Sequence, residues 1–289
     1  MDFNSWNIFW EICFGLLATL IVIGNSLTIL IFLKQNFRKR AHFLLISLAV
    51  ADLLVGLVTV PLSILANLDT SKRWRFYASL YTDINTGLAS IFTLAVISLE
   101  RMYAVGWPLR HRTLHLRAYK FAVVTPSILA TTVMSIRVLR DFRLIGHTGF
   151  QVVISMSPAA PSLVICSAYC VIWWKGRKPM DNRNQQVQRE TNLAKTLFLI
   201  TGASLLTWLP FQIVTIWPSL ISSLEMIYII KLLQFSNSLV NVIIYPFRIS
   251  EFKGALFRML QGFVTPFCRK TRIRSLRIPR TADKNETAI

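Results

Sequence analysis

Apolar residues gather in seven long stretches along the chain, separated by short polar connections. The first stretch, Cys13 to Leu33, holds 21 residues without a charged side chain, and as a helix it is long enough to cross a hydrocarbon core of about 30 Å. The other six lie at 42–66, 76–105, 118–136, 149–174, 192–221 and 225–247. The pattern predicts an all-α fold, a seven-transmembrane helix bundle over residues 1–250, in place of the two domains that 289 residues alone would suggest.

Basic residues are distributed unevenly between the two sets of connections. The connections at 34–41, 101–120 and 175–195 hold 15 Lys and Arg, the tail from Arg248 holds 10, and only seven remain for the other side. Because cytoplasmic loops carry the excess of basic residues, we expect a multi-pass plasma-membrane protein with an extracellular N-terminus and a cytoplasmic C-terminus. The net charge of +19 then favours contact with anionic membrane lipid, and the apolar spans argue against a nucleic-acid partner.

A mixed pattern follows the seventh stretch. Ile249, Phe252, Leu256 and Leu260 recur at helical spacing, with charged residues on the other side. This spacing predicts a short amphipathic helix over 251–267 that lies on the inner membrane surface.

The last part of the chain, residues 268–289, is basic and is expected to be a disordered cytoplasmic tail. Cys268 is a candidate for acylation, with a free cytosolic thiol as the equal alternative. Thr287 lies two residues before the C-terminal Ile289, a pattern that suits strand addition into the groove of a PDZ-domain protein.

Residue types that enzymes use are not clustered in this sequence. The four cysteines fall in predicted spans or in the tail (Cys13, Cys166, Cys170 and Cys268), so no external disulfide is expected. No Cys/His set has metal-ligand spacing, and no glycine-rich phosphate loop is present. The histidines His111, His115 and His147 lie in predicted loops, where we expect solvated side chains. We therefore expect a protein that is not an enzyme.

Several predicted spans contain polar residues at mid-membrane depth. These residues are Asn25, Asp52, Ser90, Asn237, Ser238 and Asn241. An isolated Asn often serves only as a hydrogen bond between helices, but a buried Asp must be offset by a cation, a proton or several donors. One acid with neutral oxygens from several helices suits a small hard cation, so Asp52 is the candidate centre of such a site.

The third span ends in an acid and a base side by side, Glu100 and Arg101. Because a charge deep in the bilayer costs about 3 kcal/mol, this pair suggests a switch, in which a carboxylate holds the arginine in one state and releases it in another. In the sixth span, Pro210 follows Trp208 by two residues. Proline removes a backbone hydrogen bond and kinks a helix, so this position is either a hinge or a packing kink.

Short motifs occur in every span except the fourth, each at a matching depth. They are Gly24-Asn25, Leu48-Ala49-Val50-Ala51-Asp52, Glu100-Arg101-Met102, Pro161 with Tyr169, Trp208-Leu209-Pro210 and Asn241-x-x-x-Tyr245. In these motifs the chain resembles the rhodopsin-like (class A) G-protein-coupled receptors over residues 12–268. The resemblance implies a cell-surface receptor that binds an extracellular ligand and activates heterotrimeric G proteins through a conformational switch.

The resemblance also implies a cation site. In that family, residues that match Asp52, Ser90, Trp208, Asn237 and Asn241 surround an allosteric sodium ion, and all five are present here. An allosteric sodium ion is therefore expected, and no other cofactor.

Further roles follow for the activation switch. The residue that matches Arg101 contacts the G protein, and Glu190 occupies the position of its resting-state carboxylate partner. Tyr169 and Tyr245 match tyrosines that swing inward in the active state, and the switch set also includes the prolines Pro161 and Pro210.

The chain departs from the family pattern at several positions. Met102 replaces the usual tyrosine after the arginine, and Val242 replaces the proline of the seventh-span motif. Phe76 replaces the cysteine that ties the third span to the second external loop, and that loop, at 137–149, has no cysteine. We therefore expect a ligand mouth that is looser or open to the side.

An acid marks the expected ligand pocket. Asp83 lies 18 residues before Arg101, about 27 Å closer to the outside along a helix, at the position that resembles the amine-binding aspartate of aminergic receptors. The other residues of the expected pocket are Gly87, Ser157, Phe211, Lys231 and Phe235.

Lys231 and Phe235 leave the ligand class open. Phe235 has no hydroxyl where aminergic receptors carry a tyrosine, and both Lys231 and Arg137 are candidate partners of Asp83 near the mouth. Amine, peptide and lipid ligands all remain alternatives. A retinal-binding opsin is a second interpretation, but its lysine would stand where Phe235 stands. A seven-helix transporter is a third, and no internal repeat supports it.

Overall fold

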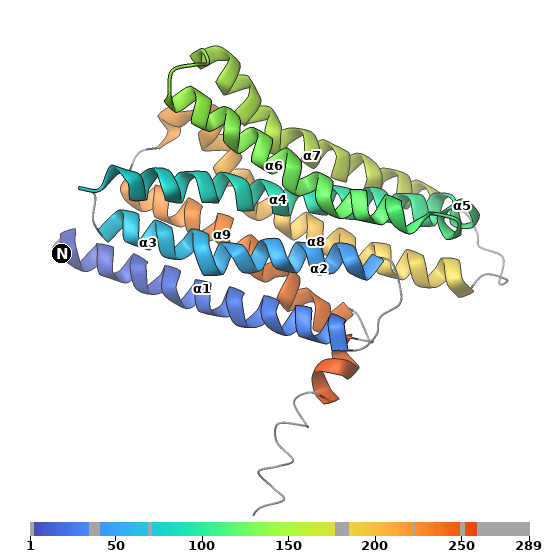
Figure 1. Cartoon of the computed structure of the whole chain (residues 1–289). Coiled ribbons are helices and arrows are strands. Elements are labelled where there is room, and N and C mark those ends of the chain that lie inside the picture. The colour runs from blue at the N-terminus through green and yellow to red at the C-terminus, as the bar shows by residue number, and fades with distance from the viewer. Residues whose placement is uncertain are drawn as a thin grey trace, which may run out of the picture.

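The structure is a computed structural model that describes residues 3–34, 41–68, 71–176, 185–221, 223–248 and 252–258. These residues form a bundle of long helices (Figure 1). In chain order the elements are α1 (Phe3–Lys34), α2 (Ala41–Leu54), the π-helical η1 (Val55–Thr59), α3 (Val60–Leu68), α4 (Arg73–Gly106), α5 (Pro108–Arg112), α6 (Leu116–Asp141), α7 (His147–Gly176), α8 (Gln185–Ile216), the 3₁₀ turn η2 (Pro218–Leu220) and α9 (Leu224–Arg248). No strand occurs within the described ranges, and the predicted all-α fold is confirmed.

The long helices correspond to the predicted membrane spans. Within the described residues, six are long and apolar enough to cross a membrane, with α2, η1 and α3 together forming the second. In α8 the apolar part is Thr201–Ile216, and it follows a more polar first half. The predicted seven-transmembrane bundle is therefore confirmed.

One predicted boundary is wrong, at the connection between α6 and α7. The loop expected at 137–149 is shorter, because α6 continues to Asp141 and α7 begins at His147. Arg143 has a φ of 60°, the left-handed conformation that commonly ends a helix, and its N–H donates to the carbonyl of Arg140 at 2.9 Å. This tight turn reverses the chain within a few residues.

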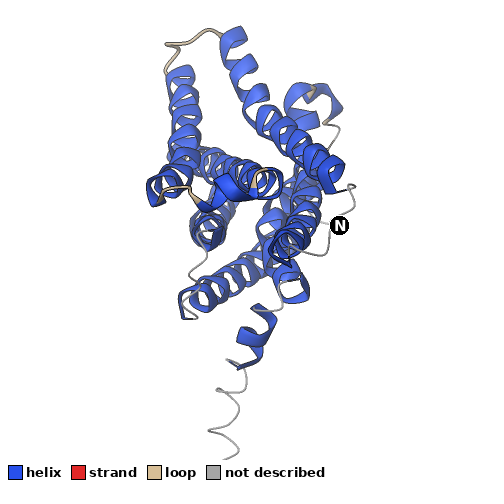
Figure 2. Cartoon of the chain, turned by 90° about the vertical axis from the view of Figure 1, so that its right-hand side faces the viewer, coloured by secondary structure: helices blue, strands red, loops and turns tan. Residues whose placement is uncertain are grey.

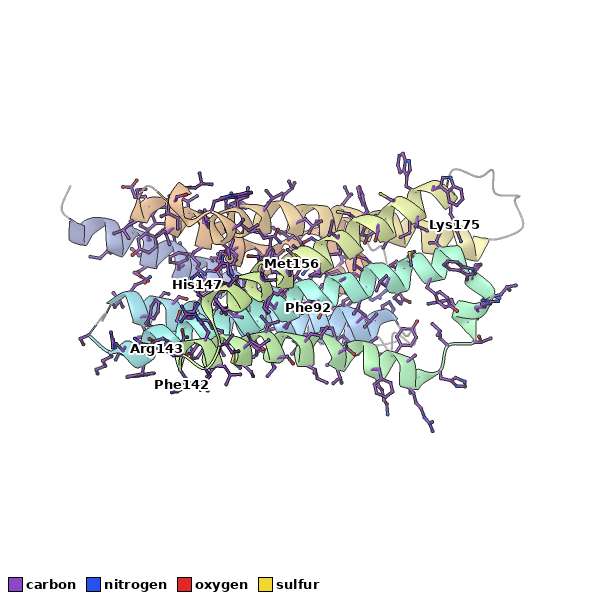
Figure 3. The ribbon with its side chains drawn as sticks, turned by 90° about the horizontal axis from the view of Figure 1, so that it is seen from above. Phe92, Phe142, Arg143, His147, Met156 and Lys175 are labelled. Atoms are coloured by element: carbon purple, nitrogen blue, oxygen red, sulfur yellow. The ribbon has the colours of Figure 1, made fainter. Side chains whose placement is uncertain are left out.

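The two ends of the bundle carry different side chains (Figure 3). Phe142 and Arg143 lie at one end and Lys175 lies at the other; we call these the Arg143 end and the Lys175 end. Lys175 donates to the carbonyl of Gly106 at 3.2 Å, and its ammonium lies 3.8 Å from the centroid of the Trp107 ring. These contacts join the last turns of α4 and α7.

Helix α4 is central to the bundle. It contacts α2, α3, α6, α7 and α8, and Figure 2 views this assembly from the end that carries α5. Its inward face buries Asp83, Ser90 and Arg101 along its length. By contrast, Leu16 of α1 and Leu206 of α8 are more than half exposed, as expected for helices whose outer faces contact lipid.

The second span is interrupted by the π-helical turn η1. The N–H of Val60 donates to the carbonyl of Val55, five residues earlier. Pro61 follows, and proline cannot donate a backbone hydrogen bond, which accounts for the altered pairing. The wider turn brings Thr59 to the interior, where its hydroxyl lies 2.9 Å from that of Thr86 in α4.

Helices α1 and α9 approach each other closely near the middle of the bundle. The amide of Asn25 donates to the carbonyls of Ile21 and Ser238, both at 3.0 Å. Gly24 permits this approach, because a Cβ on Gly24 would lie only 2.5 Å from Cγ1 of Val242.

A short helical segment follows α9, over residues 252–258. Its Phe252 is buried and lies against Phe32 of α1, with the ring centroids 5.6 Å apart. Ala255 is also buried, and Leu256 packs against the hydrophobic cluster that includes Phe32, Phe252 and Ala255. The buried face agrees with the predicted amphipathic pattern, and the rest of the predicted helix over 251–267 lies outside the described residues.

The contact between Gly24 and Val242 predicts a position-specific loss of stability. Gly24→Ala is expected to lower the melting temperature of the purified protein, because overpacking costs about 1–3 kcal/mol. Gly15→Ala is the matched control in the same helix, since nothing lies within 4 Å of a Cβ there and alanine is the better helix former. Adding Val242→Ala to Gly24→Ala should bring the melting temperature back toward that of the unchanged protein. Equal melting temperatures for the two single variants would contradict the contact.

Candidate functional site

Buried polar side chains line the interior of the bundle. They come from α1, α2, α4 and α9, and each is at most 2% exposed: Asn25, Asp52, Ser90, Asn237, Ser238 and Asn241. Polar groups are expensive to bury among membrane helices and usually mark a functional interior. The structure therefore brings together polar residues that are far apart in the sequence, on four different spans.

Asp52 is the centre of this polar interior. The hydroxyl of Ser90 donates to Asp52 Oδ1 at 3.0 Å, and the amide of Asn241 donates to Asp52 Oδ2 at 2.6 Å. Asp52 is fully buried, and none of the ion pairs found between described residues includes it. Its carboxylate is thus held by neutral donors, without a cation from the protein in the described ranges.

Two side-chain amides near Asp52 have oxygen atoms that accept no hydrogen bond from the described residues. Within the described part of the chain, buried Asn237 Oδ1 and Asn241 Oδ1 have no hydrogen-bond partner. Amide oxygens beside a carboxylate form the donor set that small hard cations prefer. The chemistry of the residues around Asp52 therefore suits a small cation, and the cation itself stays a prediction.

A small cavity, with room for about one water molecule, lies between this region and the Arg143 end. Its lining consists of Val55, Asp83, Thr86, Gly87, Ser90, Trp208, Gln234, Phe235, Asn237 and Ser238. Trp208 forms one wall, and a Cβ on Gly87 would lie 2.8 Å from its ring. The absence of a side chain at Gly87 thus makes room for the tryptophan, and the cavity has Asp83 and Asn237 on its surface.

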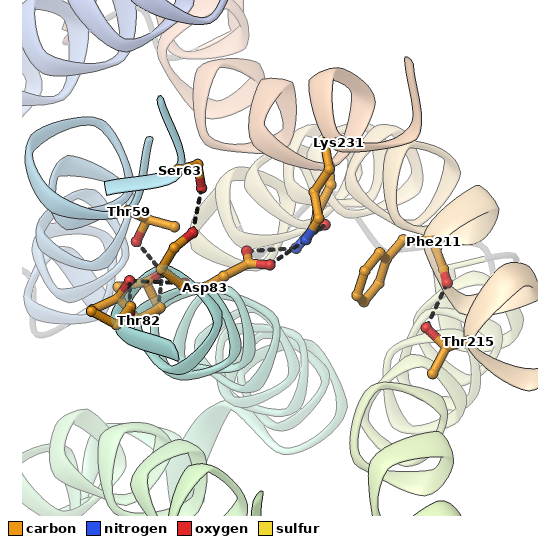
Figure 4. Close-up of polar contacts among 11 residues, drawn as sticks. Thr59, Ser63, Thr82, Asp83, Phe211, Thr215 and Lys231 are labelled. Carbon is orange, nitrogen blue, oxygen red and sulfur yellow. Dashed lines mark hydrogen bonds and ion pairs between the residues drawn. The ribbon is translucent and has the colours of Figure 1, made fainter. Parts of the chain in front are cut away.

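Asp83 forms a compact charged group with two residues of α9 (Figure 4). The ammonium of Lys231 pairs with Asp83 Oδ2, and the amide of Gln234 donates to Asp83 Oδ1 at 2.9 Å. Lys231 also donates to Gln234 Oε1 at 3.1 Å. The side chain of Asp83 is 8% exposed and that of Lys231 is 28% exposed, so the pair is largely removed from solvent.

Aromatic rings surround the ammonium of Lys231. Its nitrogen lies 4.7 Å from the centroid of Phe211 and 5.8 Å from that of Phe235, distances at which a cation is attracted to a ring face. Phe211 in turn packs edge-on against Trp208 at 5.7 Å. A carboxylate and several rings together form a site shaped for an ammonium group.

Other residues of the expected pocket lie elsewhere. The hydroxyl of Ser157 donates to the carbonyl of Ile154 in its own helix at 3.0 Å, and Ser157 is not among the cavity-lining residues. Arg137, considered as a partner of Asp83, pairs instead with Asp141 at 3.0 Å. Gln234 was not among the expected pocket residues, although it lies one helical turn after Lys231 and so on the same face.

The acid and base at the end of the third span form the predicted pair. Arg101 donates to Glu100 through Nε and pairs with it through Nη2. Arg101 is only 2% exposed. A fully buried guanidinium held by a carboxylate is suited to a charge-dependent switch, because breaking the pair leaves an uncompensated charge.

His111 is also part of this group, contrary to the expectation of a solvated histidine. Its Nε2 lies 2.8 Å from Glu100 Oε1, and the hydroxyl of Tyr119 donates to the same oxygen at 3.0 Å. The expectation was wrong because residues 108–112 form the short helix α5, which begins with Pro108. This helix holds His111 against Glu100 of α4. A proline that starts a short helix was the available signal.

The remaining switch residues occupy helices α7, α8 and α9. Tyr169 is buried and packs edge-on against Phe198 at 5.2 Å, while Pro161 and Pro210 lie inside α7 and α8. Glu190 and Tyr245 belong to α8 and α9, but their side chains lie outside the described residues. The expected acylation site Cys268 and the PDZ-type residues Thr287 and Ile289 lie outside the described residues altogether.

Known proteins share this sequence pattern over most of the chain. The family described as 7 transmembrane receptor (rhodopsin family) matches residues 24–141 and 146–245. The chain is similar to trace amine-associated receptor 7b of Mus musculus, with 28% identity over 294 residues, 87% of this chain and 82% of the relative. It is also similar to trace amine-associated receptor 7e of Rattus norvegicus, with 27% identity over 292 residues, 86% of this chain and 81% of the relative. The protein therefore belongs to the rhodopsin-like (class A) family of G-protein-coupled receptors.

Proposed function

We propose that this receptor binds an extracellular ligand with an ammonium group at Asp83 and activates a heterotrimeric G protein through Arg101. The observation that carries the proposal is the placement of Asp83: a nearly buried carboxylate on a cavity lined by Trp208 and Phe235. The names of the similar trace amine-associated receptors support an amine ligand.

The chemistry of the pocket favours a cation over a neutral ligand. A carboxylate in a water-poor cavity attracts an ammonium group more strongly than it does in water, and aromatic faces add to this attraction. Lys231 illustrates the fit, since its own ammonium contacts Asp83 and lies over Phe211. A ligand amine would use the same contacts.

The proposed signal reaches the Lys175 end as a shift between two states. Glu100 holds Arg101, and His111 and Tyr119 hold Glu100, so Arg101 is withheld from a G protein in this arrangement. A ligand that binds the released state more tightly shifts the population toward it. Glu190 is proposed as a second resting-state partner of Arg101.

We also propose that sodium binds at Asp52 and stabilises the resting state. The carboxylate, the hydroxyl of Ser90 and the unpaired oxygens of Asn237 and Asn241 supply the ligands. Because coupling between two ligands is reciprocal, sodium must then weaken agonist binding and an agonist must weaken sodium binding.

The amine site is tested with a panel of small primary amines and a G-protein activation assay. Asp83→Asn is expected to lower the potency of each active amine by roughly several hundred-fold, because breaking a buried ion pair on one side costs about 3–5 kcal/mol. Glu225→Gln, which neutralises an exposed acid in the first turn of α9, is the matched control. Normal amine potency in a well-expressed Asp83→Asn receptor would refute the assignment. Arg101→Ala should abolish signalling in either background.

The anchoring of Glu100 is tested by ligand-free signalling. His111→Phe removes a hydrogen bond to a charged group, a loss of about 1.5–3 kcal/mol, and is expected to raise basal G-protein activation severalfold because Arg101 is then released more often. His115→Phe is the matched control, since His115 is exposed in the connection between α5 and α6. Equal basal activity in the two variants, at equal surface expression, would count against the anchoring role.

The cation site is tested by agonist binding in NaCl and in choline chloride at constant ionic strength. Agonist affinity is expected to be lower in NaCl, and Asp52→Asn should remove the difference, because it deletes the charge with little change of volume. Asp141→Asn, near the Arg143 end, should keep the sodium effect. Agonist affinity that is identical in both salts for the unchanged receptor would exclude the sodium proposal.

A further inference from the structure

The carboxylate that would receive a ligand amine is already neutralised by the receptor itself. Lys231 contacts Asp83 directly. An incoming amine would use the same contacts with the carboxylate, so it has to replace the ammonium of Lys231. Within the described residues, the other contacts of Lys231 are with neutral groups: the amide oxygen of Gln234 and the rings of Phe211 and Phe235. These groups offer the displaced ammonium no second negative charge.

A plain amine would leave the pocket with one positive charge too many. Asp83 would pair with the ligand, and Lys231 would remain in a largely enclosed site without its carboxylate. Uncompensated charge in such an environment is strongly unfavourable. A ligand that brings its own carboxylate avoids this cost, since it gives each receptor charge a new partner.

Gln234 lies where it can hydrogen-bond to both charged groups of such a ligand. Its Nε2 now donates to Asp83 and its Oε1 now accepts from Lys231. A primary amide offers a donor and an acceptor together, so the same side chain can accept from a ligand ammonium and donate to a ligand carboxylate. The two contacts of the amide are then kept on binding, and the single ion pair between Asp83 and Lys231 becomes two ion pairs with the ligand.

The cavity beside this pair is small, with room for about one water molecule, so a large ligand does not fit it. Aromatic walls at Trp208 and Phe235 suit an apolar group beside the charged one.

We propose that the ligand of this receptor is a small zwitterion of the amino-acid type, bound by exchange of the Asp83–Lys231 pair: its ammonium pairs with Asp83 and its carboxylate pairs with Lys231. This proposal rests on the proposed amine function at Asp83 and adds the second charge. Lys231 thereby becomes the residue that selects amino acids over the corresponding amines.

The test uses matched sets of compounds that share one skeleton, on the full-length receptor with a G-protein readout. Each set holds an amino acid, its decarboxylated amine, its methyl ester and its deaminated acid, for example phenylalanine, phenethylamine, phenylalanine methyl ester and 3-phenylpropionate, and the sets cover the common amino acids. In at least one set, the amino acid is expected to be at least about tenfold more potent than its amine and its ester. This comparison needs no variant, so it does not depend on a variant that folds.

A variant then assigns the preference to Lys231. Lys231→Met keeps the length of the side chain and removes its charge, and it is expected to reverse the preference, so that the amine and the ester become more potent than the amino acid. Lys72→Met, at an exposed position, should keep the wild-type order. An unchanged order in well-expressed Lys231→Met would overturn the proposal.

The outcomes separate this proposal from the proposed function. If amines activate the receptor through Asp83 and no amino acid exceeds its amine in any set, the zwitterion is excluded and the amine function stands. If deaminated acids are the most potent and depend on Lys231 alone, both are excluded. A complete lack of response to every set overturns the zwitterion as well.

Discussion

Every charge inside this bundle must find its partner within the protein, because the surrounding lipid offers none. Among the described residues, three carboxylates inside the bundle meet this constraint in three ways. Asp52 accepts hydrogen bonds from neutral donors, Asp83 pairs with a lysine, and Glu100 pairs with an arginine while a histidine and a tyrosine contact its other oxygen. Each of these three sets of contacts exists in one arrangement of the helices. A partner from outside the protein can compete with the residues that make these contacts.

Two of these carboxylates and a hydrogen-bond donor to the third lie on one helix. Asp83, Ser90 and Glu100 are all carried by α4, which contacts most of the other helices. A helix is stiff along its axis, so a rotation of α4 that changes the contacts of Asp83 also changes those of Glu100. The central position of α4 thus supports the proposal that a ligand at Asp83 acts on Arg101 through this helix, without a separate relay.

Sequence patterns were a good guide where a residue type has few physical roles in a membrane. Uninterrupted apolar stretches predicted the spans, and an acid inside such a stretch had to be functional or paired, which singled out Asp52. Features that depend on backbone irregularity or tertiary contact could not be predicted in this way. The π-helical turn η1 depends on how Pro61 is accommodated in an otherwise apolar span. His111 has the sequence surroundings of a solvated residue, and only the return of α5 beneath α4 brings it to Glu100.

The cavity brings the region of Asp83 and the polar residues near Asp52 into contact with the same enclosed space. Asp83 contributes to one part of its lining and Asn237 to another, and Trp208 borders it beside Gly87. A ligand that displaces Lys231 must therefore settle against the same tryptophan that faces the polar residues next to Asp52. Because the interior is close-packed and Gly87 leaves no spare room for the ring, a movement of Trp208 at the ligand site alters the space available around Asn237. The proposed competition between a ligand and a cation then rests on shared volume as well as on charge.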